Sequence, residues 1–140
     1  MKMQKYLDKS IYYALFAMAS GVFYREFTKV MKFEGRTYLS KVHPHVFVLG
    51  MLFYLIIYLL SFNLDFEKNP KIDKDLIYYN FGLILSIIMM MTRGIIQILY
   101  VNLTNFQNAT ISGLAGLGHT ILALSIILSL FELRKMKKID

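Results

Sequence analysis

Four stretches of apolar residues, separated by short polar connections, dominate the sequence. They run over residues 10–28, 42–62, 76–100 and 109–133. Each approaches the ~20 mostly apolar residues that an α-helix needs to cross a bilayer. The pattern predicts an all-α chain, an integral membrane four-helix antiparallel bundle, with residues 1–140 forming a single four-span transmembrane domain.

Composition supports the membrane class and narrows the chemistry. Of the 140 residues, 56% are hydrophobic, and the mean hydropathy is +0.49, whereas soluble domains are about 45–50% apolar. The chain has no cysteine. It can therefore form no disulfide, thiolate-ligated metal site, iron–sulfur cluster or Cys-attached heme.

The formal net charge of +7 comes from basic residues that flank the apolar stretches. This placement favours anchoring in a lipid bilayer over binding to nucleic acid. With four spans both termini lie on one side, where ten basic residues gather against four on the other. The positive-inside rule then predicts the bacterial cytoplasmic membrane with both termini cytoplasmic. The ten are Lys2, Lys5, Lys9, Lys68, Lys71, Lys74, Arg134, Lys135, Lys137 and Lys138, and the four are Lys29, Lys32, Arg36 and Lys41.

All three histidines lie in or at the edge of apolar stretches. His43 and His45 open the second stretch, and His119 lies inside the fourth. A buried imidazole costs free energy unless a partner or a ligand compensates for lost water. The histidines are therefore the first candidates for a functional site.

The start of the second helix decides where two of these rings point. Ser40 is a plausible N-cap, which would make Pro44 the fourth helical residue, where a missing N–H has no intrahelical partner. His43 and His45 are two residues apart and so point to nearly opposite faces. With this helix start, His43 lies on the same helical face as Gly50.

His119 stands out on a stripe of small residues. Ser112, Ala115, Gly116, His119 and Ala123 fall on one helical face. A flat macrocycle standing against a helix needs this arrangement, a ligating ring with little bulk on either side. The alternative is a tight helix–helix contact in which His119 bonds a carbonyl or hydroxyl group.

The predicted topology places these groups in one half of the membrane. At a rise of ~1.5 Å per residue, His45 lies ~7 Å and His119 ~13–15 Å inside their helices, both measured from the outer side. Arg25 and Arg93 also approach that side, and Asn80 is the exception. This concentration of polar side chains favours a ligand site in the outer half.

Neutral imidazole is a ligand for heme iron, zinc and copper. We expect one non-covalent b-type heme, with His45 and His119 as axial ligands and His43 as the alternative or supporting residue. Such a protein would act in heme capture, redox protection or electron transfer. A three-histidine zinc or copper site is the rival, but the opposed directions of His43 and His45 make convergence awkward.

Two arginines complete the expected heme site, with Gly116 on the heme-facing stripe. Arg25 ends the first span and Arg93 lies near the end of the third, and an intramembrane arginine is by default a functional or pairing group. Both would neutralise heme propionates. Alternatively, Arg25 only extends to the headgroups, and Arg93 pairs with Glu26.

Four segments, GVFYREFTK, HPHVFVLGMLF, MMMTRGIIQ and ISGLAGLGH, occur in this order. With them the chain resembles an uncharacterised family of small four-helix bacterial membrane proteins (a domain of unknown function), which implies fold and membrane location. In layout it is more loosely similar to the heme-bearing helices of heme–copper oxidase main subunits. The small heme-capturing membrane proteins of Gram-positive bacteria are a further likeness. The chain has too few histidines for a full oxidase site.

A function of another class needs no cofactor. The chain could be a membrane interaction or assembly subunit, a homo-oligomer or the companion of a membrane partner. Its histidines and arginines would then satisfy contacts between helices, and the stripe of Ala14, Ala17 and Gly21 would be a packing surface. No arrangement of serine, cysteine or paired carboxylates indicates hydrolysis. The sequence does not decide whether the protein is an enzyme.

Overall fold

The computed structural model describes residues 3–66 and 68–137, and within them it contains helices and no strand. Helix α1 is Gln4–Val30. The second helical stretch is continuous and consists of α2 (Leu39–His45), the π-helix η1 (Val46–Leu52) and α3 (Phe53–Leu60). Helix α4 is Pro70–Ile98 and α5 is Asn105–Lys135. The all-α prediction is confirmed.

Three of the four helical stretches are long and apolar enough to cross a membrane, namely Leu39–Leu60, Pro70–Ile98 and Asn105–Lys135. Helix α1 is not among them, although it is 27 residues long. Its uncharged part is confined to residues 10–24, between Lys9 and Arg25. The apolar character of the chain is therefore weakest in the first predicted span.

The starts of α4 and α5 follow from local sequence. The Asn69 side chain accepts a hydrogen bond from the Lys71 N–H at 3.2 Å, and Pro70 is the first helical residue, where its missing N–H costs nothing. Thr104 and Gln107 form a reciprocal capping box at the start of α5. Each cap therefore fixes the residue at which its helix begins.

The predicted Ser40 N-cap is wrong. Helix α2 begins at Leu39, and the Ser40 hydroxyl instead donates to the Thr37 carbonyl at 2.8 Å. A contact with α4 explains the earlier start. The Thr37 hydroxyl donates to the Gly94 carbonyl at 2.9 Å and accepts from the Leu39 N–H at 3.2 Å.

Pro44 is consequently the sixth residue of α2, within the helix. There it removes a backbone hydrogen bond and crowds the preceding turn. The π-helix η1 begins two residues later, and its wider turns continue the helical path. Gly50 of η1 faces α1 so closely that an added Cβ would come within 2.6 Å of the Tyr13 ring.

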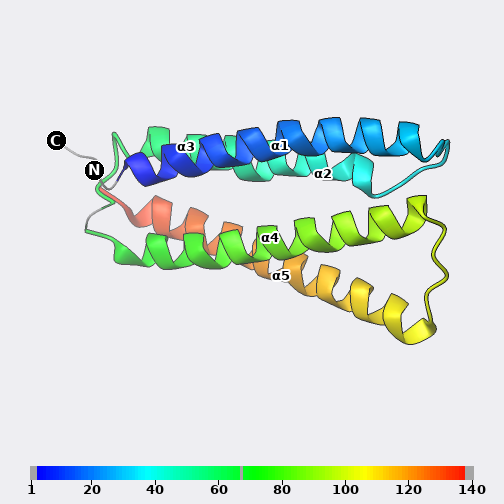
Figure 1. Cartoon of the computed structure of the whole chain (residues 1–140). Helices are drawn as coiled ribbons and strands as arrows, with labels where there is room; N and C mark the ends of the chain where they lie inside the picture. The colour runs from blue at the N-terminus through cyan, green and yellow to red at the C-terminus, as the bar shows by residue number, and fades with distance from the viewer. Residues whose placement is uncertain (1–2, 67, 138–140) are drawn as a thin grey trace.

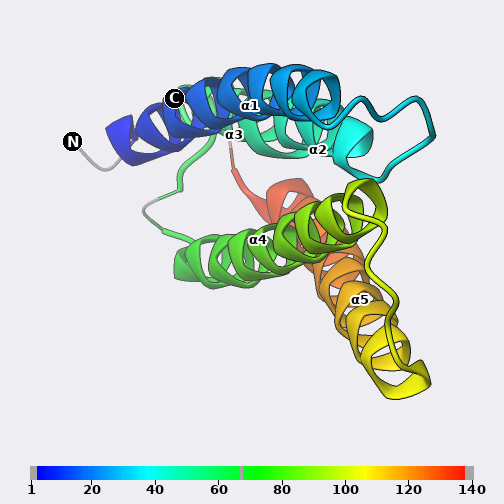
Figure 2. The same ribbon diagram turned by 45° about the vertical axis from the view of Figure 1, so that its right-hand side comes forward.

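The helices form two packed pairs. Helix α1 lies along the α2–α3 stretch, and α4 lies beneath this pair with α5 against it (Figures 1 and 2). Helices α4 and α5 touch at two glycines. A Cβ added to Gly82 would lie 2.7 Å from the Leu122 nitrogen. A Cβ added to Gly118 would lie 2.8 Å from the Ser86 hydroxyl. Beyond this crossing, the N-terminal half of α5 diverges from α4 (Figure 2).

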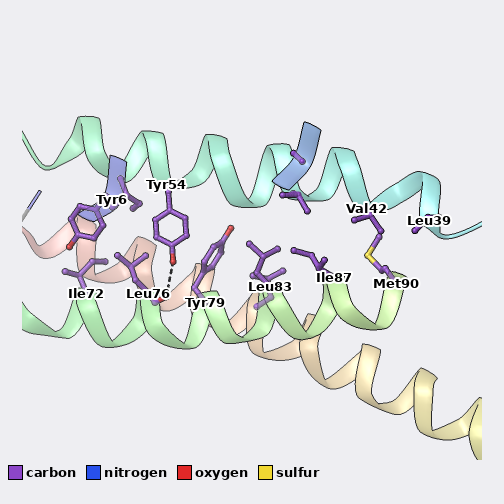
Figure 3. Packing of buried hydrophobic residues seen from close by; sticks show 14 of the residues in the cluster. Tyr6, Leu39, Val42, Tyr54, Ile72, Leu76, Tyr79, Leu83, Ile87 and Met90 are labelled. Atoms are coloured by element: carbon purple, nitrogen blue, oxygen red, sulfur yellow. Dashed lines mark hydrogen bonds between the residues drawn. The ribbon is translucent and has the colours of Figure 1, made fainter. Parts of the chain in front are cut away.

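The main core lies between the α2–α3 stretch and α4. Tyr54 and Tyr79 are fully buried there, and the Tyr54 hydroxyl donates to the Leu76 carbonyl at 3.2 Å (Figure 3). Around them are Leu39, Val42, Val46, Ile57, Ile72, Leu76, Leu83, Ile87 and Met90. The aromatic and aliphatic packing holds α4 to the first helix pair.

Polar contacts tie the helix ends together where α1 begins and α5 ends (Figure 1). The Lys5 ammonium lies 2.6 Å from the Asp73 carboxylate, to which the Tyr6 hydroxyl also donates at 2.7 Å. The Asn69 amide donates to Glu132 at 3.0 Å. This end of the molecule is closed, in contrast to the end where α4 and α5 diverge.

Candidate functional site

The divergence of α4 and α5 creates a cavity of about 380 Å³, which we call the α4–α5 wedge. Its walls combine apolar residues of both helices with one histidine and four other side chains that carry polar groups. The lining residues are Tyr38, Met89, Met90, Arg93, Gln97, Ile111, Ser112, Ala115 and His119. The wedge therefore brings together two of the predicted site residues, Arg93 and His119.

A backbone carbonyl selects one tautomer of the neutral His119 ring. Its Nδ1 lies 2.8 Å from the Ala115 carbonyl oxygen, which can only accept, so in the neutral ring Nδ1 carries the proton and Nε2 a lone pair. The ring is exposed, and within residues 3–66 and 68–137 nothing hydrogen-bonds to Nε2. Metal-ligating histidines are commonly oriented by this kind of N–H to carbonyl bond.

Arg93 crosses the wedge from α4 to α5. Its guanidinium donates to the Asn108 side-chain oxygen at 2.6 Å and to the Ser112 hydroxyl at 2.8 Å. Both acceptors are neutral, so the positive charge has no carboxylate partner in the described part of the chain. The predicted alternative pairing with Glu26 is wrong, because Arg93 turns toward α5 while Glu26 lies 3.8 Å from Arg25.

His45 lies outside the residues that line the wedge. It follows Tyr38, which does line the wedge, by seven positions, so both lie on one side of the helix. The His45 Nδ1 donates to the Lys41 carbonyl at 2.8 Å, which in the neutral ring leaves Nε2 with its lone pair, as in His119. His45 is half-buried.

His43 has a different environment, in the contact between α1 and α2. Its Nδ1 donates to the Ala17 carbonyl at 2.8 Å, and its ring meets Phe47 edge-on at 5.1 Å between centroids. An added Cβ at Gly21 would lie 3.0 Å from Nδ1. Gly50 also faces α1, through Tyr13, so the face that His43 and Gly50 share packs on α1.

Arg25 and Gly116 do not join the wedge. The Arg25 side chain is 80% exposed beside Glu26 at the end of α1. A Cβ at Gly116 would meet nothing within 4 Å. Within the described ranges, no three His, Cys, Asp or Glu residues are grouped to hold a metal ion. A three-histidine zinc or copper centre thus lacks its donor set in this arrangement.

Sequence reasoning overlooked Asn108. It lies in the first turns of α5, fifteen positions after Arg93, and carries no periodic signal. The available signal was the short uncharged connection between the third and fourth predicted spans, which places an amide opposite the arginine on an antiparallel neighbour. Tyr38 was also overlooked, because it precedes the apolar stretch.

The chain belongs to the family described as "Protein of unknown function (DUF2871)", which matches residues 3–136. The predicted membership of an uncharacterised family is thereby confirmed. Among the curated proteins and the solved structures, none matches the chain. The looser likeness to heme–copper oxidase helices and to heme-capturing membrane proteins stays without support.

Proposed function

We propose that this DUF2871 protein is a small integral membrane protein that binds one b-type heme in the α4–α5 wedge. The observation that carries the proposal is His119, whose Nε2 lone pair is free in the wedge that the uncompensated Arg93 guanidinium also lines. An imidazole can ligate heme iron, and a guanidinium can bind a propionate carboxylate.

The membrane part of the proposal is a four-span antiparallel bundle in the bacterial cytoplasmic membrane with both termini inside. Three stretches have the required length and apolarity. Helix α1 supports a fourth span through its outward apolar residues, among them Ile11, Leu15, Met18 and Val22, all exposed. The inside is assigned to the end where α1 begins, by the count of basic residues. Two residues of that count, Lys2 and Lys138, lie outside the described residues.

Within the wedge, His119 is the primary iron ligand, and the Ala115 carbonyl keeps its ring in the ligating tautomer. Arg93 faces a propionate, and Met89 and Ile111 supply apolar walls. His45 would be the candidate for a second iron ligand because its Nε2 is also free of a hydrogen bond. A bound heme would supply one-electron chemistry at its iron, suited to heme capture, redox protection or electron transfer.

Iron content is the direct test. The full chain is purified from heme-replete cells, and iron, zinc and copper per chain are measured together with the absorption spectrum. The proposal expects a Soret band and iron near one atom per chain. A colourless protein that also fails to take up added hemin would refute it, and zinc or copper in place of iron would support the rival metal site.

A cofactor-free interaction subunit is the second candidate, and the exposed start of α5 favours it. Phe106, Leu114 and Leu117 are exposed there, and α5 packs chiefly on α4. A second copy or another membrane protein could cover this surface. This function predicts that His119→Ala folds normally but loses an association detectable by crosslinking in the membrane.

A further inference from the structure

A second cavity, of about 400 Å³, lies between α1 and α4, and we call it the α1–α4 groove. It shares no lining residue with the α4–α5 wedge. Its wall is mostly apolar, with four residues that carry polar groups near one end. The lining residues are Lys9, Tyr12, Tyr13, Phe16, Asn80, Ile84, Ile87, Ile88 and Met91.

The groove has a polar end and an apolar end. Helices α1 and α4 run in the same direction (Figure 1), so Lys9 on α1 and Asn80 on α4 both precede the apolar lining residues. From Asn80 to Met91 the α4 wall extends for about 16 Å at the α-helical rise. A groove of this length and polarity fits one extended acyl chain below a polar head.

Asn80 presents an unused donor to the groove. Its side-chain oxygen accepts from the Tyr13 hydroxyl at 2.5 Å and from the Tyr54 hydroxyl at 3.4 Å. With the amide in this orientation, the Nδ2 group has no acceptor among the described residues. A ligand carbonyl or carboxylate would satisfy it.

Lys9 supplies a positive charge without an ion-pair partner at the same end. Its ammonium lies 5.0 Å from the centroid of the Tyr54 ring, and no carboxylate of the described chain forms an ion pair with it. The neighbouring Lys5 is already paired with Asp73. An ammonium beside an apolar groove favours an anionic amphiphile over a neutral one.

We infer that the α1–α4 groove binds one acyl chain of an anionic lipid. The anionic head lies at Lys9, a carbonyl or carboxylate oxygen accepts from Asn80 Nδ2, and the chain runs toward Met91. An anionic phospholipid and a free fatty acid share this chemistry. The inference does not depend on the wedge or on heme.

The test counts lipids bound to the full chain. The purified protein is equilibrated in detergent with equal amounts of dioleoyl phosphatidylglycerol and dioleoyl phosphatidylcholine, and retained lipid is counted by native mass spectrometry. A second arm replaces phosphatidylglycerol with oleate. We expect one retained anionic lipid, and a loss of about fivefold in Lys9→Gln, since a lysine near an anionic surface contributes about 1 kcal/mol.

Matched variants separate binding from damage to the fold. Ile84→Trp fills the groove and should abolish retention, whereas Ile77→Trp, exposed on α4 outside the groove, should not. Lys74→Gln, exposed near the same end, is the charge control. Retention of oleate alone would assign a free fatty acid. Equal retention of the two phospholipids without oleate binding, or equal anionic retention by Lys9→Gln and wild type, would overturn the inference.

Discussion

His43 and His119 make the same bond in two different settings. Each donates its Nδ1 proton to a backbone carbonyl at 2.8 Å. For His43 the carbonyl is that of Ala17 on another helix, and the ring is enclosed by Phe47 and Gly21. For His119 the carbonyl is that of Ala115, one turn back on its own helix, and the ring is exposed.

The difference shows how a histidine in an apolar stretch can be structural or available for ligation. When the imidazole hydrogen-bonds to a neighbouring helix, it links the two helices, and the packed side chains leave no room for a ligand beside the ring. A bond within the helix satisfies one nitrogen and leaves the other open to a ligand. The two roles predict opposite outcomes for the same substitution.

The largest expected effect is His119→Ala against His43→Ala. His119→Ala should eliminate the Soret band and leave the thermal midpoint in detergent nearly unchanged, because the ring is exposed. His43→Ala should keep the heme but lose about 1–3 kcal/mol of stability, because it empties the α1–α2 contact and removes the hydrogen bond from His43 to the Ala17 carbonyl. Loss of the spectrum in His43→Ala alone would reverse the assignment.

His45→Ala comes next and tests the second axial position. Heme should be retained through His119, while the low-spin spectrum gives way to a high-spin one because the iron loses one ligand. Absorption and electron paramagnetic resonance spectra measure the change. An unaltered spectrum would mean that His45, outside the residues lining the wedge, is not a ligand.

Two glycines of α5 contrast the packed and the open parts of that helix. Gly118→Ala places a Cβ 2.8 Å from the Ser86 hydroxyl and should cost about 1–3 kcal/mol through overpacking. Gly116→Ala meets open space and should be neutral or stabilise by up to about 1 kcal/mol through helix propensity. Thermal midpoints in detergent report both. Equal effects would contradict the close crossing of α4 and α5.

The last comparison separates the two arginines. Arg93→Ala should raise the heme dissociation constant about tenfold or more, as for a charged hydrogen bond of about 1.5–3 kcal/mol, with the ligand spectrum unchanged. Arg25→Ala, at an exposed position, is the matched control and should leave it unchanged. Hemin titration measures both constants. A larger loss in Arg25→Ala would restore the sequence-based expectation for that residue.

The helices were predictable from the sequence because a long apolar run offers its backbone N–H and C=O groups few hydrogen-bond partners other than one another. The predicted start of α2 was wrong because Thr37 contacts Gly94, 57 residues away, and no local pattern contains that contact. Arg93 was recognisable as a charge within an apolar stretch. Its partner was not, because the choice between Glu26 and Asn108 depends on which helices are neighbours.

The stripe around His119 was only partly informative for the same reason. Ser112 and Ala115 do line the wedge, whereas Gly116 on the predicted face meets open space. The glycine that packs is Gly118, against Ser86. Periodicity identifies a face of a helix, but the crossing point along that face depends on tertiary packing.

Because a π-helix follows Pro44, the number of residues in this segment determines how α3 is turned relative to α2. A π turn contains an extra residue relative to an α turn, so η1 rotates α3 with respect to α2. Deleting a single residue between Val46 and Leu52 would convert the path to ordinary α-helix and turn Tyr54 and Ile57 away from the core they now fill. Homologous chains should therefore keep the spacing between Pro44 and Tyr54 constant, even where the side chains between them differ.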